Sequence, residues 1–359
     1  MHPHPEHTSL LIVTDAWRPQ INGVVRSLEA TIHELEKMGV RVEILAPHEF
    51  TTIPCPTYPD IRLSLTRRKT VRRRILDHQC EHLHIATEGP LGLLAASAAR
   101  SIGMPFTTGY HSRFPEYAVA RFPLPIQWFY AWFRRFHNSG DGCMVATETL
   151  KQDLAAKGFR NLMIWSRGVD TDLFRPMEGS VLPPDLPRPI FMNVGRLAVE
   201  KNLGAFLDLD LPGTKVVVGE GPLLAGLKRD YPDVIFTGPK TGEDLVRHFC
   251  SADAFVFPSL TDTFGLVVLE ALACGVPVAA FPVMGPRDVI GDGGAGALSD
   301  DLRQAALEAL DIPAERCRAW AMRYSWAACA RQFIDNANVA QSTYQTRSAD
   351  RTRPANAQG

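Results

Sequence analysis

The chain has 359 residues, a length that accommodates two domains of ordinary size, each with its own core. Its apolar content of 45% and charged content of 21% are typical of a soluble globular protein, and a net charge of −1 gives no electrostatic reason to expect nucleic-acid binding. The seven cysteines include no CxxC pair, which argues for reduced thiols and against a disulfide framework or a zinc site.

The first seven residues lack the apolar core of a signal peptide, and no run of 18 or more apolar residues follows. We therefore expect a cytoplasmic protein. Any contact with the inner face of the cytoplasmic membrane would be peripheral.

Residues 10–14 form an apolar run that predicts a strand buried on both faces of a parallel sheet. An amphipathic helix ending at Gly39 and a strand over residues 40–45 follow. This βαβ opening is typical of a doubly wound sheet, which binds ligands near its first loop. Asn22 and Gly23 lie in that loop, where glycine lets the backbone approach an anion or a bulky ligand closely; a tight turn that needs glycine is the alternative.

Two segments of this half combine basic and aromatic residues. Residues 67–74 (Arg-Arg-Lys-Thr-Val-Arg-Arg-Arg) are either a solvated helix face or an electrostatic contact with anionic lipid. Residues 125–137 carry six aromatic residues beside two arginines, as interfacial helices do, although ordinary core packing gives the same pattern. Together they predict a peripheral membrane contact as one of two interpretations.

A predicted strand over residues 105–110 leads into His111. A lone histidine at a strand end is more often structural than catalytic, but the carboxyl ends of parallel strands line the ligand crevice. Its position therefore favours a functional role. Arg113 and Glu116 follow closely and are candidates for contact with a ligand bound there.

The βα pattern restarts with a strand over residues 190–194. The loop and helix start after it carry Arg196 and Lys201, two cations that can converge on one diphosphate without a metal. The alternative is that both are surface residues that contribute only to solubility. Upstream, Asp170 and Asp172 form a DxD pair. A divalent-metal site is one reading of this pair, but its place in a crossover before a Pro-rich segment favours a linker.

Residues 254–277 predict a strand, a polar turn and a helix that begins at Gly265. A helix N-terminus at the carboxyl end of a sheet is an anion site, because its first amide groups lack partners. Asp262 lies in the turn, and Glu270 lies about two helical turns further on. The two acids can meet different parts of an elongated ligand; a helix cap and a solvated surface residue are the alternatives.

These motifs as a set resemble glycosyltransferase family 4, retaining enzymes of the two-domain GT-B fold, from the first strand to about residue 336. The likeness is greatest to bacterial lipid-directed mannosyltransferases and diacylglycerol glycosyltransferases. It implies an α/β protein with two Rossmann-like doubly wound parallel-sheet domains facing across a cleft. The implied bounds are 1–168 and 169–317, with a C-terminal helix at about 318–340 that crosses back to the first domain. The tail over 341–359 is rich in Ser, Thr, Arg, Gln and Asn and lacks apolar periodicity, so we expect it to be disordered.

The resemblance also implies the roles of the site residues. Arg196 and Lys201 would stabilise the departing diphosphate, Asp262 would position the donor sugar, Glu270 would hold the ribose and His111 would neighbour the sugar. The common family form has Glu where this chain has Asp262, one methylene shorter. The full set of implied donor-binding residues is Asn22, Gly23, Gly195, Arg196, Lys201, Gly221, Asp262, Phe264, Gly265, Leu266 and Glu270.

The implied activity is transfer of a hexose from GDP-mannose or a UDP-hexose to a glycerolipid or lipid-linked glycan, with an α-glycosidic bond formed. No cofactor or metal is expected. Three alternatives remain: a sugar-nucleotide epimerase of the same architecture, a non-catalytic sugar-nucleotide-binding module, and a nicotinamide dehydrogenase. The last is weakly supported, because the first loop is not GxGxxG.

Overall fold

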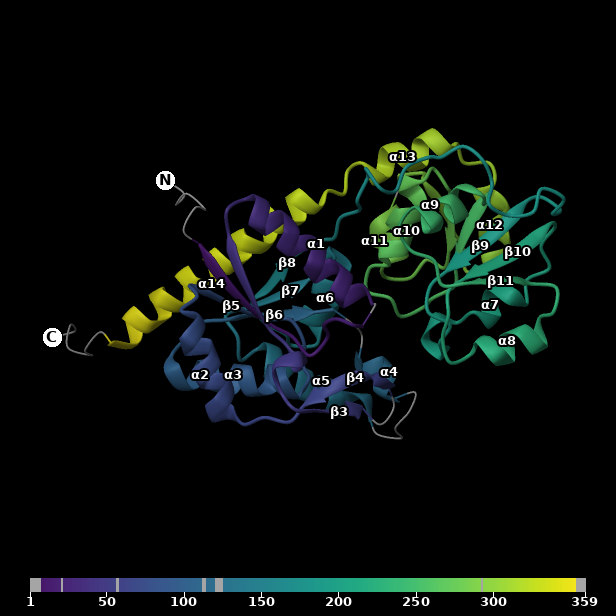
Figure 1. Ribbon diagram of the computed structural model, residues 1–359. Helices are drawn as coiled ribbons and strands as arrows, with labels where there is room; N and C mark the ends of the chain where they lie inside the picture. Colours follow the sequence, from purple (N-terminus) through teal and green to yellow (C-terminus); the bar gives the residue numbers. More distant parts are fainter. Residues whose placement is uncertain are drawn as a thin grey trace. The chain divides into compact units, whose positions relative to one another are not determined.

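The computed structural model describes residues 8–20, 22–55, 58–111, 114–119, 125–291 and 293–352. The chain divides into two compact units, each built on a parallel sheet (Figure 1). Unit 1 comprises Met1–Ser166 and Trp326–Gly359, and unit 2 comprises Arg167–Ser325. The predicted pair of parallel-sheet α/β domains is therefore confirmed.

Unit 1 contains a six-stranded sheet in which all neighbouring strands run parallel. Its first strand is buried along its whole length, as the apolar run predicted. In spatial order the strands are β2 (Arg41–Leu45), β1 (Ser9–Val13), β5 (His82–Ile85), β6 (Thr107–Tyr110), β7 (Gly142–Val145) and β8 (Leu162–Ile164). A separate antiparallel pair joins β3 (Thr52–Cys55) and β4 (Tyr58–Ser64).

Helices cover both faces of this sheet because β1 has apolar side chains on both. Leu10 and Ile12 belong to one core cluster with residues of α1 and α14, whereas Leu11 and Val13 belong to another with α2 and α3. The helices of unit 1 are α1 (Gly23–Lys37), the 3₁₀ turn η2 (Pro47–Glu49), α2 (Arg68–His78), α3 (Pro90–Ile102), α4 (Phe114–Val119), α5 (Ile126–His137), α6 (Glu148–Ala156) and α14 (Trp326–Thr352).

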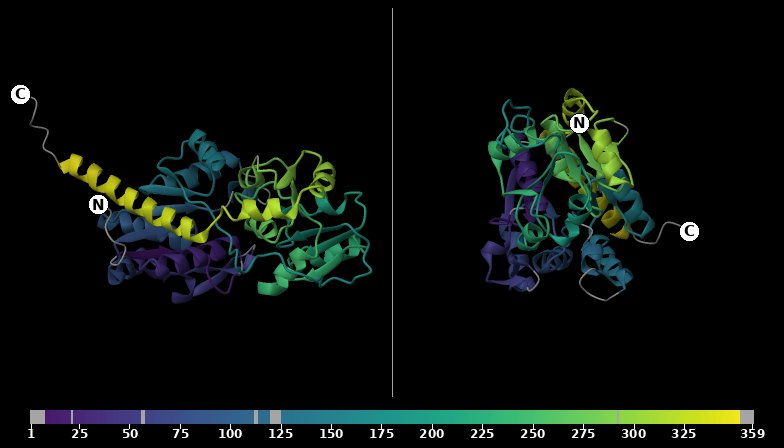
Figure 2. Two further views of the ribbon diagram at one scale, coloured as in Figure 1. Left: turned by 90° about the horizontal axis from the view of Figure 1, so that it is seen from above. Right: turned by 90° about the vertical axis from the view of Figure 1, so that its right-hand side faces the viewer.

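The last helix, α14, completes the core of the first unit. It lies alongside α1 (Figures 1 and 2). Phe333 is fully buried against Trp165, with ring centroids 4.9 Å apart. The Trp165 indole N–H donates to Cys329 Sγ at 3.0 Å, and the side-chain amide of Asn336 donates to the Ile164 carbonyl at 2.7 Å.

The C-terminal tail corrects one prediction. Residues 341–359 were expected to be disordered, but α14 continues to Thr352; residues 353–359 lie outside the described part of the chain. The apolar pattern does fade there. The hydroxyls of Ser342, Thr343 and Thr346 nevertheless bond to carbonyls four residues earlier, which is compatible with a helix.

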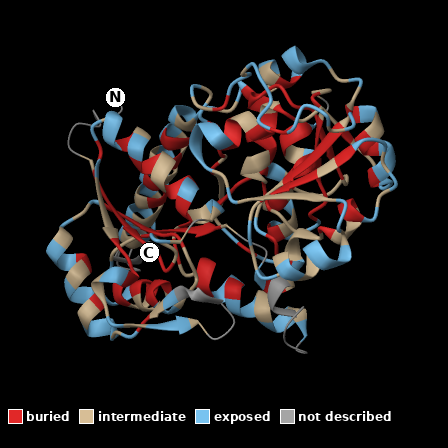
Figure 3. Ribbon diagram, turned by 45° about the vertical axis from the view of Figure 1, so that its right-hand side comes forward, coloured by how far each residue is buried: buried red, intermediate tan, exposed pale blue. Residues whose placement is uncertain are grey.

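Unit 2 repeats the plan, and the central strands of both sheets are buried, whereas the edge strands are only partly so (Figure 3). Its parallel sheet has the order β11 (Ile235–Gly238), β10 (Thr214–Val218), β9 (Ile190–Val194), β12 (Ala254–Phe257), β13 (Val278–Ala280) and β14 (Gly296–Leu298). The helices are η3 (Val199–Lys201), α7 (Gly204–Leu207), α8 (Leu224–Asp230), α9 (Gly242–Cys250), α10 (Leu266–Ala273), α11 (Pro286–Ile290), α12 (Leu302–Ala309) and α13 (Ala314–Ala321).

Each sheet has a point where the strand order reverses. The chain in unit 1 runs outward from β1 to β2 and then returns to β5 on the other side of β1; in unit 2 it makes the same reversal between β9 and β12. Ligands of open parallel sheets bind outside the carboxyl ends of the strands at such a point. The loops that follow β1, β5, β9 and β12 are therefore the places to look for a site. Among the described residues, no helix has the length and apolar character needed to span a membrane.

Candidate functional site

The reversal point of unit 2 holds a close pair of opposite charges. Lys201 follows β9 and Asp262 follows β12, and these two strands are neighbours in the sheet. Lys201 Nζ donates to both carboxylate oxygens of Asp262, at 2.7 and 2.9 Å. Both side chains keep some solvent access, 28% for Lys201 and 18% for Asp262. Two predicted site residues 61 positions apart in sequence therefore meet at one sheet edge.

Further hydrogen bonds hold the loops after β9 and β12 together. The hydroxyls of Ser259 and Thr261 donate to the Glu200 carbonyl at 3.4 and 3.5 Å. The side-chain amide of Asn202 donates to the Pro258 carbonyl at 3.1 Å. The ammonium–carboxylate pair is therefore held by a network of loop contacts, which limits the entropy lost when a ligand binds.

Two glycines let the loop after β10 approach the loop after β9 closely. A Cβ at Gly219 would lie 1.9 Å from the Gly195 carbonyl oxygen, and a Cβ at Gly221 would lie 2.4 Å from the Leu197 carbonyl oxygen. Only glycine fits at both positions. The Leu197 amide completes the contact by donating to the Glu220 carbonyl at 2.8 Å. The structure therefore places Gly195 and Gly221 in two loops that contact each other through their backbones at the carboxyl ends of β9 and β10.

The turn before α10 is also closely packed. Gly265 has the left-handed conformation, with φ at +87°, and precedes the first residue of the helix, Leu266. Phe264 is buried, and its ring meets Tyr324 edge-on at 6.3 Å. A Cβ at Gly285 would lie 2.7 Å from the Asp262 carbonyl oxygen, so the next loop lies directly against this turn. The predicted strand, polar turn and helix are all present.

The two remaining predicted residues of unit 2 differ in exposure. Arg196 is exposed at the carboxyl end of β9, before the turn that ends in Lys201. Glu270 is only 4% exposed, within the buried face of α10. The alternative that Glu270 is a solvated surface residue is therefore wrong.

In unit 1, Asn22 is the N-cap of α1. Its side-chain oxygen accepts from the amides of Val24 and Val25, both at 3.0 Å. Gly23 is exposed with an ordinary backbone conformation, and a Cβ there would meet nothing within 4 Å. The alternative that a tight turn requires this glycine is therefore wrong. The fold itself leaves open space beside Gly23.

His111 directly follows β6 and is half-buried. Its ring meets Trp165 edge-on, with centroids 5.4 Å apart. The ring also folds back over the strand, since a Cβ at Gly109 would lie 2.6 Å from His111 Nε2. The histidine is thus placed at a carboxyl strand end, as predicted, and its orientation depends on the missing side chain of Gly109.

A buried carboxylate at the reversal point of unit 1 was not identified from the sequence. Asp15 follows β1 and is 5% exposed. It accepts from the amides of Leu91 and Gly92 at 2.9 and 3.1 Å and from the Thr87 hydroxyl at 3.0 Å. Burial raises the pKa of Asp15 despite these bonds. It caps the N-terminus of α3 and ties the ends of β1 and β5 together.

A second overlooked pair joins Glu88 and His137. His137 is completely buried in the aromatic helix α5, and its Nε2 lies 3.0 Å from the Glu88 carboxylate. Its Nδ1 lies 2.9 Å from the Thr108 hydroxyl and 3.5 Å from Cys143 Sγ. Burial opposes a charge on the ring, but Cys143 and Glu88 outweigh it and raise the pKa of His137 to about 10. The contact with Glu88 therefore favours the protonated ring.

The remaining predicted residues have various environments. Arg113 lies outside the described residues. Glu116 accepts from the Tyr130 hydroxyl at 2.6 Å, a contact between α4 and α5. The Asp170 side chain caps a turn by accepting from the amides of Asp172 and Leu173, as expected of a linker.

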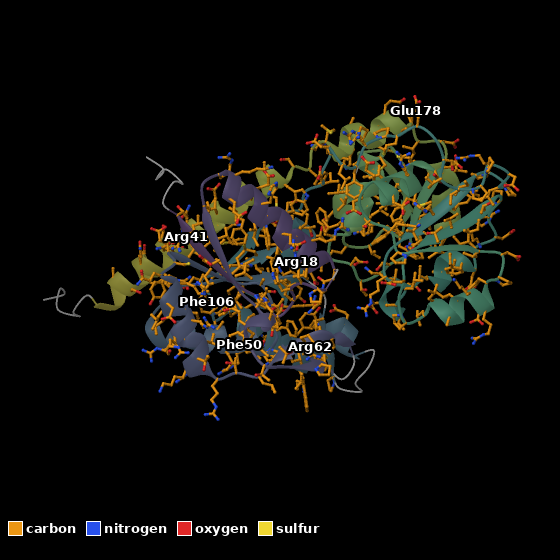
Figure 4. All side chains as sticks on the ribbon, in the orientation of Figure 1. Arg18, Arg41, Phe50, Arg62, Phe106 and Glu178 are labelled. Atoms are coloured by element: carbon orange, nitrogen blue, oxygen red, sulfur yellow. The ribbon has the colours of Figure 1, made fainter. Side chains whose placement is uncertain are left out.

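The two basic and aromatic segments form helices with exposed faces. The run over 67–74 lies at the start of α2, whose side chains with nitrogen ends extend away from the rest of unit 1 (Figure 4). The aromatic segment is α5. It buries Phe133 and Phe136 but exposes Trp128 by 66% and Trp132 by 42%.

Comparison with known proteins identifies the class of protein to which this chain belongs. The sequence profile described as Glycosyltransferase Family 4 matches residues 21–173, and that described as Glycosyl transferases group 1 matches residues 188–312. A sucrose-phosphate synthase from Thermosynechococcus elongatus has a similar structure, with a TM-score of 0.72 and 19% identity over 95% of this chain and 100% of that one. Anabaena HepE in complex with UDP has a TM-score of 0.66 and 16% identity over 92% and 100%.

Proteins with similar sequences are also named as glycosyl-transferring enzymes. A GDP-mannose-dependent alpha-mannosyltransferase from Mycobacterium tuberculosis is 31% identical over 304 residues, which cover 78% of this chain and 80% of the relative. An alpha-monoglucosyldiacylglycerol synthase from Streptococcus pneumoniae is 28% identical over 342 residues, covering 83% and 77%. The fold is that of the GT-B glycosyltransferases. The chain belongs to glycosyltransferase family 4.

Proposed function

We propose that this glycosyltransferase moves a hexose from a nucleoside diphosphate sugar to a hydroxyl acceptor, with an α-glycosidic bond formed and the anomeric configuration retained. The contact between Lys201 and Asp262 at the reversal point of unit 2 carries the proposal. A sugar diphosphate has a dianionic part next to a hydroxyl-rich part. A cation and a carboxylate in contact match those two parts.

Lys201 and Asp262 would exchange partners when the donor binds. The carboxylate neutralises the ammonium in the donor-free protein, and a diphosphate carries more negative charge than one carboxylate. The diphosphate would therefore take Lys201, with Arg196 as the second cation. Asp262 would then be released to accept hydrogen bonds from sugar hydroxyls. Its side chain is one methylene shorter than the Glu of the common family form, so it favours a sugar seated close to the turn.

Charge develops on the diphosphate as the glycosidic bond breaks. Lys201, Arg196 and the first amides of α10, next to Phe264, Gly265 and Leu266, would stabilise that charge without a metal. The bond from the anomeric carbon to phosphate oxygen breaks, and the bond to the acceptor oxygen forms on the same face. The leaving phosphate oxygen takes the proton of the acceptor hydroxyl.

The other predicted residues keep the roles that the family resemblance implies. Glu270 would hold the ribose, although its burial allows contact only with a ligand that reaches the buried edge of α10. Asn22 and Gly23 would face the diphosphate and the acceptor, and His111 the transferred sugar. Glu116 and Arg113 would contact the acceptor.

The relatives narrow the donor and the acceptor. Several of them are named GDP-mannose-dependent alpha-mannosyltransferases, from Mycobacterium, Corynebacterium and Mycolicibacterium species. Another is named for a glucosylated diacylglycerol. We therefore infer GDP-mannose as the first donor to test and a glycerolipid as the first acceptor, with UDP-hexoses next. The exposed sides of α2 and α5 would hold the enzyme peripherally on the cytoplasmic face of the membrane.

The test is turnover with defined substrates. The purified chain should transfer mannose from GDP-mannose to diacylglycerol or a lipid extract after EDTA treatment, and the product should be cleaved by an α-mannosidase. UDP-glucose and UDP-galactose are run in parallel. A changed sugar nucleotide without lipid would instead identify an epimerase. Donor binding without any product would identify a binding module, and either result would overturn the proposal.

Gly23 gives an independent test of the donor site. Gly23→Ala should leave stability unchanged or raise the free energy of unfolding by about 0.4–1 kcal/mol, because the position has an ordinary conformation and open space. A ligand that fills this space would meet the added methyl group. The affinity for the donor should then fall roughly tenfold, or about 1.4 kcal/mol. Melting temperature and donor titration give the two values.

Gly219→Ala is the contrasting variant, because it changes a glycine that the fold itself requires. Its Cβ would collide with the Gly195 carbonyl, so that variant should lose stability as well as donor binding. Unchanged donor affinity in Gly23→Ala would remove Gly23 from the site.

A further inference from the structure

A pocket lined by none of the predicted donor- or acceptor-binding residues opens between α3 and α5 of unit 1, and its α5 wall belongs to the predicted membrane-contact segment 125–137. It has a volume of about 500 Å³, within the range of small-molecule sites. Residues from the middle and end of α3 line one wall, and residues from the end of α5 and the following turn line the other. The lining residues are Leu93, Ala96, Arg100, Trp132, Arg135, Phe136, Asn138 and Ser139.

The charges in this α3–α5 pocket are of one sign. Arg100 and Arg135 both line it, and none of the described residues that line it is acidic. Arg100 is fixed by a bond from Nη1 to the Ser139 hydroxyl at 2.7 Å. Partial burial and the nearby guanidinium of Arg135 lower the pKa of Arg100, which means that the two cations repel each other. A bound dianion would relieve that repulsion.

The rest of the α3–α5 pocket is apolar. Leu93, Ala96 and Phe136 form part of its surface, and Trp132 extends it to the solvent with 42% of its area exposed. Inorganic phosphate would leave this surface uncovered. A phosphate ester with a short apolar portion would cover part of this surface while its phosphate pairs with both cations.

We propose that the α3–α5 pocket binds the phosphate group of an anionic membrane phospholipid, with Arg100 and Arg135 on the phosphate and Trp132 against the glycerol and first acyl carbons. Exposed Trp128 lies one turn before Trp132 on the same helix, and α2, which carries the basic run, packs against α3. The neighbouring surface therefore suits a membrane. This lipid is a ligand separate from the acceptor, and its binding does not require the proposed transfer reaction.

A submicellar short-chain lipid tests the proposal on the full chain without a membrane surface. Dihexanoyl phosphatidic acid, titrated calorimetrically, should bind, and Arg100→Gln/Arg135→Gln should weaken binding roughly tenfold or more. Arg100→Lys/Arg135→Lys should recover part of the loss, because charge remains while bidentate geometry does not. Neither variant should change the circular dichroism spectrum.

The control removes two exposed arginines elsewhere in unit 1. Arg41→Gln/Arg331→Gln changes the net charge equally, on β2 and α14, and should bind the lipid as the unmodified chain does (Arg41 is labelled in Figure 4). Equal loss in this control would identify diffuse attraction and overturn the proposal.

Two further ligands distinguish the source of the phosphate. Inorganic phosphate should bind at least roughly tenfold more weakly than dihexanoyl phosphatidic acid, since it covers no apolar surface. Dihexanoyl phosphatidylcholine, which has no net charge, should also bind more weakly. Equal binding of inorganic phosphate would assign the α3–α5 pocket to a soluble phosphate, and equal binding of phosphatidylcholine would remove charge recognition; both contradict the proposal. Because no sugar donor is used, these results are independent of the transfer assay.

Discussion

Lys201→Ala is expected to lower kcat for hexose transfer by roughly 10²–10³, the effect typical of removing one group that stabilises charge in a transition state. The cation lies in contact with Asp262 at the reversal point of the second sheet, where the departing diphosphate is proposed to bind. Steady-state kinetics with the best nucleotide sugar give the measurement. The melting temperature should change little, because the pair is partly exposed.

Lys228→Ala is the matched control for this change. That lysine lies in the last turn of α8 in the same unit and should be kinetically silent. Asp262→Asn adds a second arm. It should impair sugar positioning while leaving the ammonium available for a phosphate, so nucleoside diphosphate alone should bind at least as tightly as to the unmodified chain. Near-normal turnover of Lys201→Ala would end the diphosphate role.

His137→Ala is expected to lower the free energy of unfolding of unit 1 by about 3–5 kcal/mol at pH 7, because it removes one partner of a buried ion pair. The His137 ring is wholly buried and Glu88 is only 18% exposed, so removing the ring leaves a mostly buried carboxylate without its partner. Five of the six tryptophans, Trp17, Trp128, Trp132, Trp165 and Trp326, belong to unit 1, so urea unfolding followed by tryptophan emission reports mainly on that unit. His33→Ala, an exposed change on α1, should alter stability by less than about 0.5 kcal/mol.

The same pair predicts a pH dependence with a definite sign. The pKa of His137 is raised to about 10 from an ordinary value near 6.5, so the folded state holds the proton more tightly than the unfolded state. Its contribution to stability is complete below pH 6.5 and is lost as the pH rises to 10. Unfolding at pH 6 and pH 9.5 should therefore differ more in the unmodified chain than in His137→Ala. Equal pH dependence in the two chains would contradict a buried imidazolium.

The elements with a strong periodic signal were predictable. The apolar run at residues 10–14 became a strand buried throughout, and the strand, turn and helix over residues 254–273 appeared with the helix after Gly265. Lys201 and Asp262 could each be placed at a carboxyl strand end from the local pattern. That those two ends adjoin depends on strand order, which no local pattern encodes. The family resemblance supplied that order.

Features that depend on tertiary contacts were not predictable. His137 and Glu88 are 49 residues apart, and in the sequence the histidine simply ends an aromatic helix. Asp15 looked like a loop residue because its partners, Leu91 and Gly92, are backbone amides that no side-chain pattern reveals. The prediction of a disordered tail was wrong for a different reason: the helix there shows little apolar pattern and has side-chain hydroxyls bonded to its own carbonyls.

The position of α14 has a consequence for biosynthesis. Cys329, Ala330 and Phe333 occupy the core of the first unit, although the whole second unit is encoded before them. A ribosome that has released residues 1–166 has therefore delivered every strand of the first sheet but not the helix that covers Trp165. Domains usually mature in the order of their synthesis. Here we expect the second unit to mature first, while the earlier one keeps an uncovered apolar face until α14 has been synthesised.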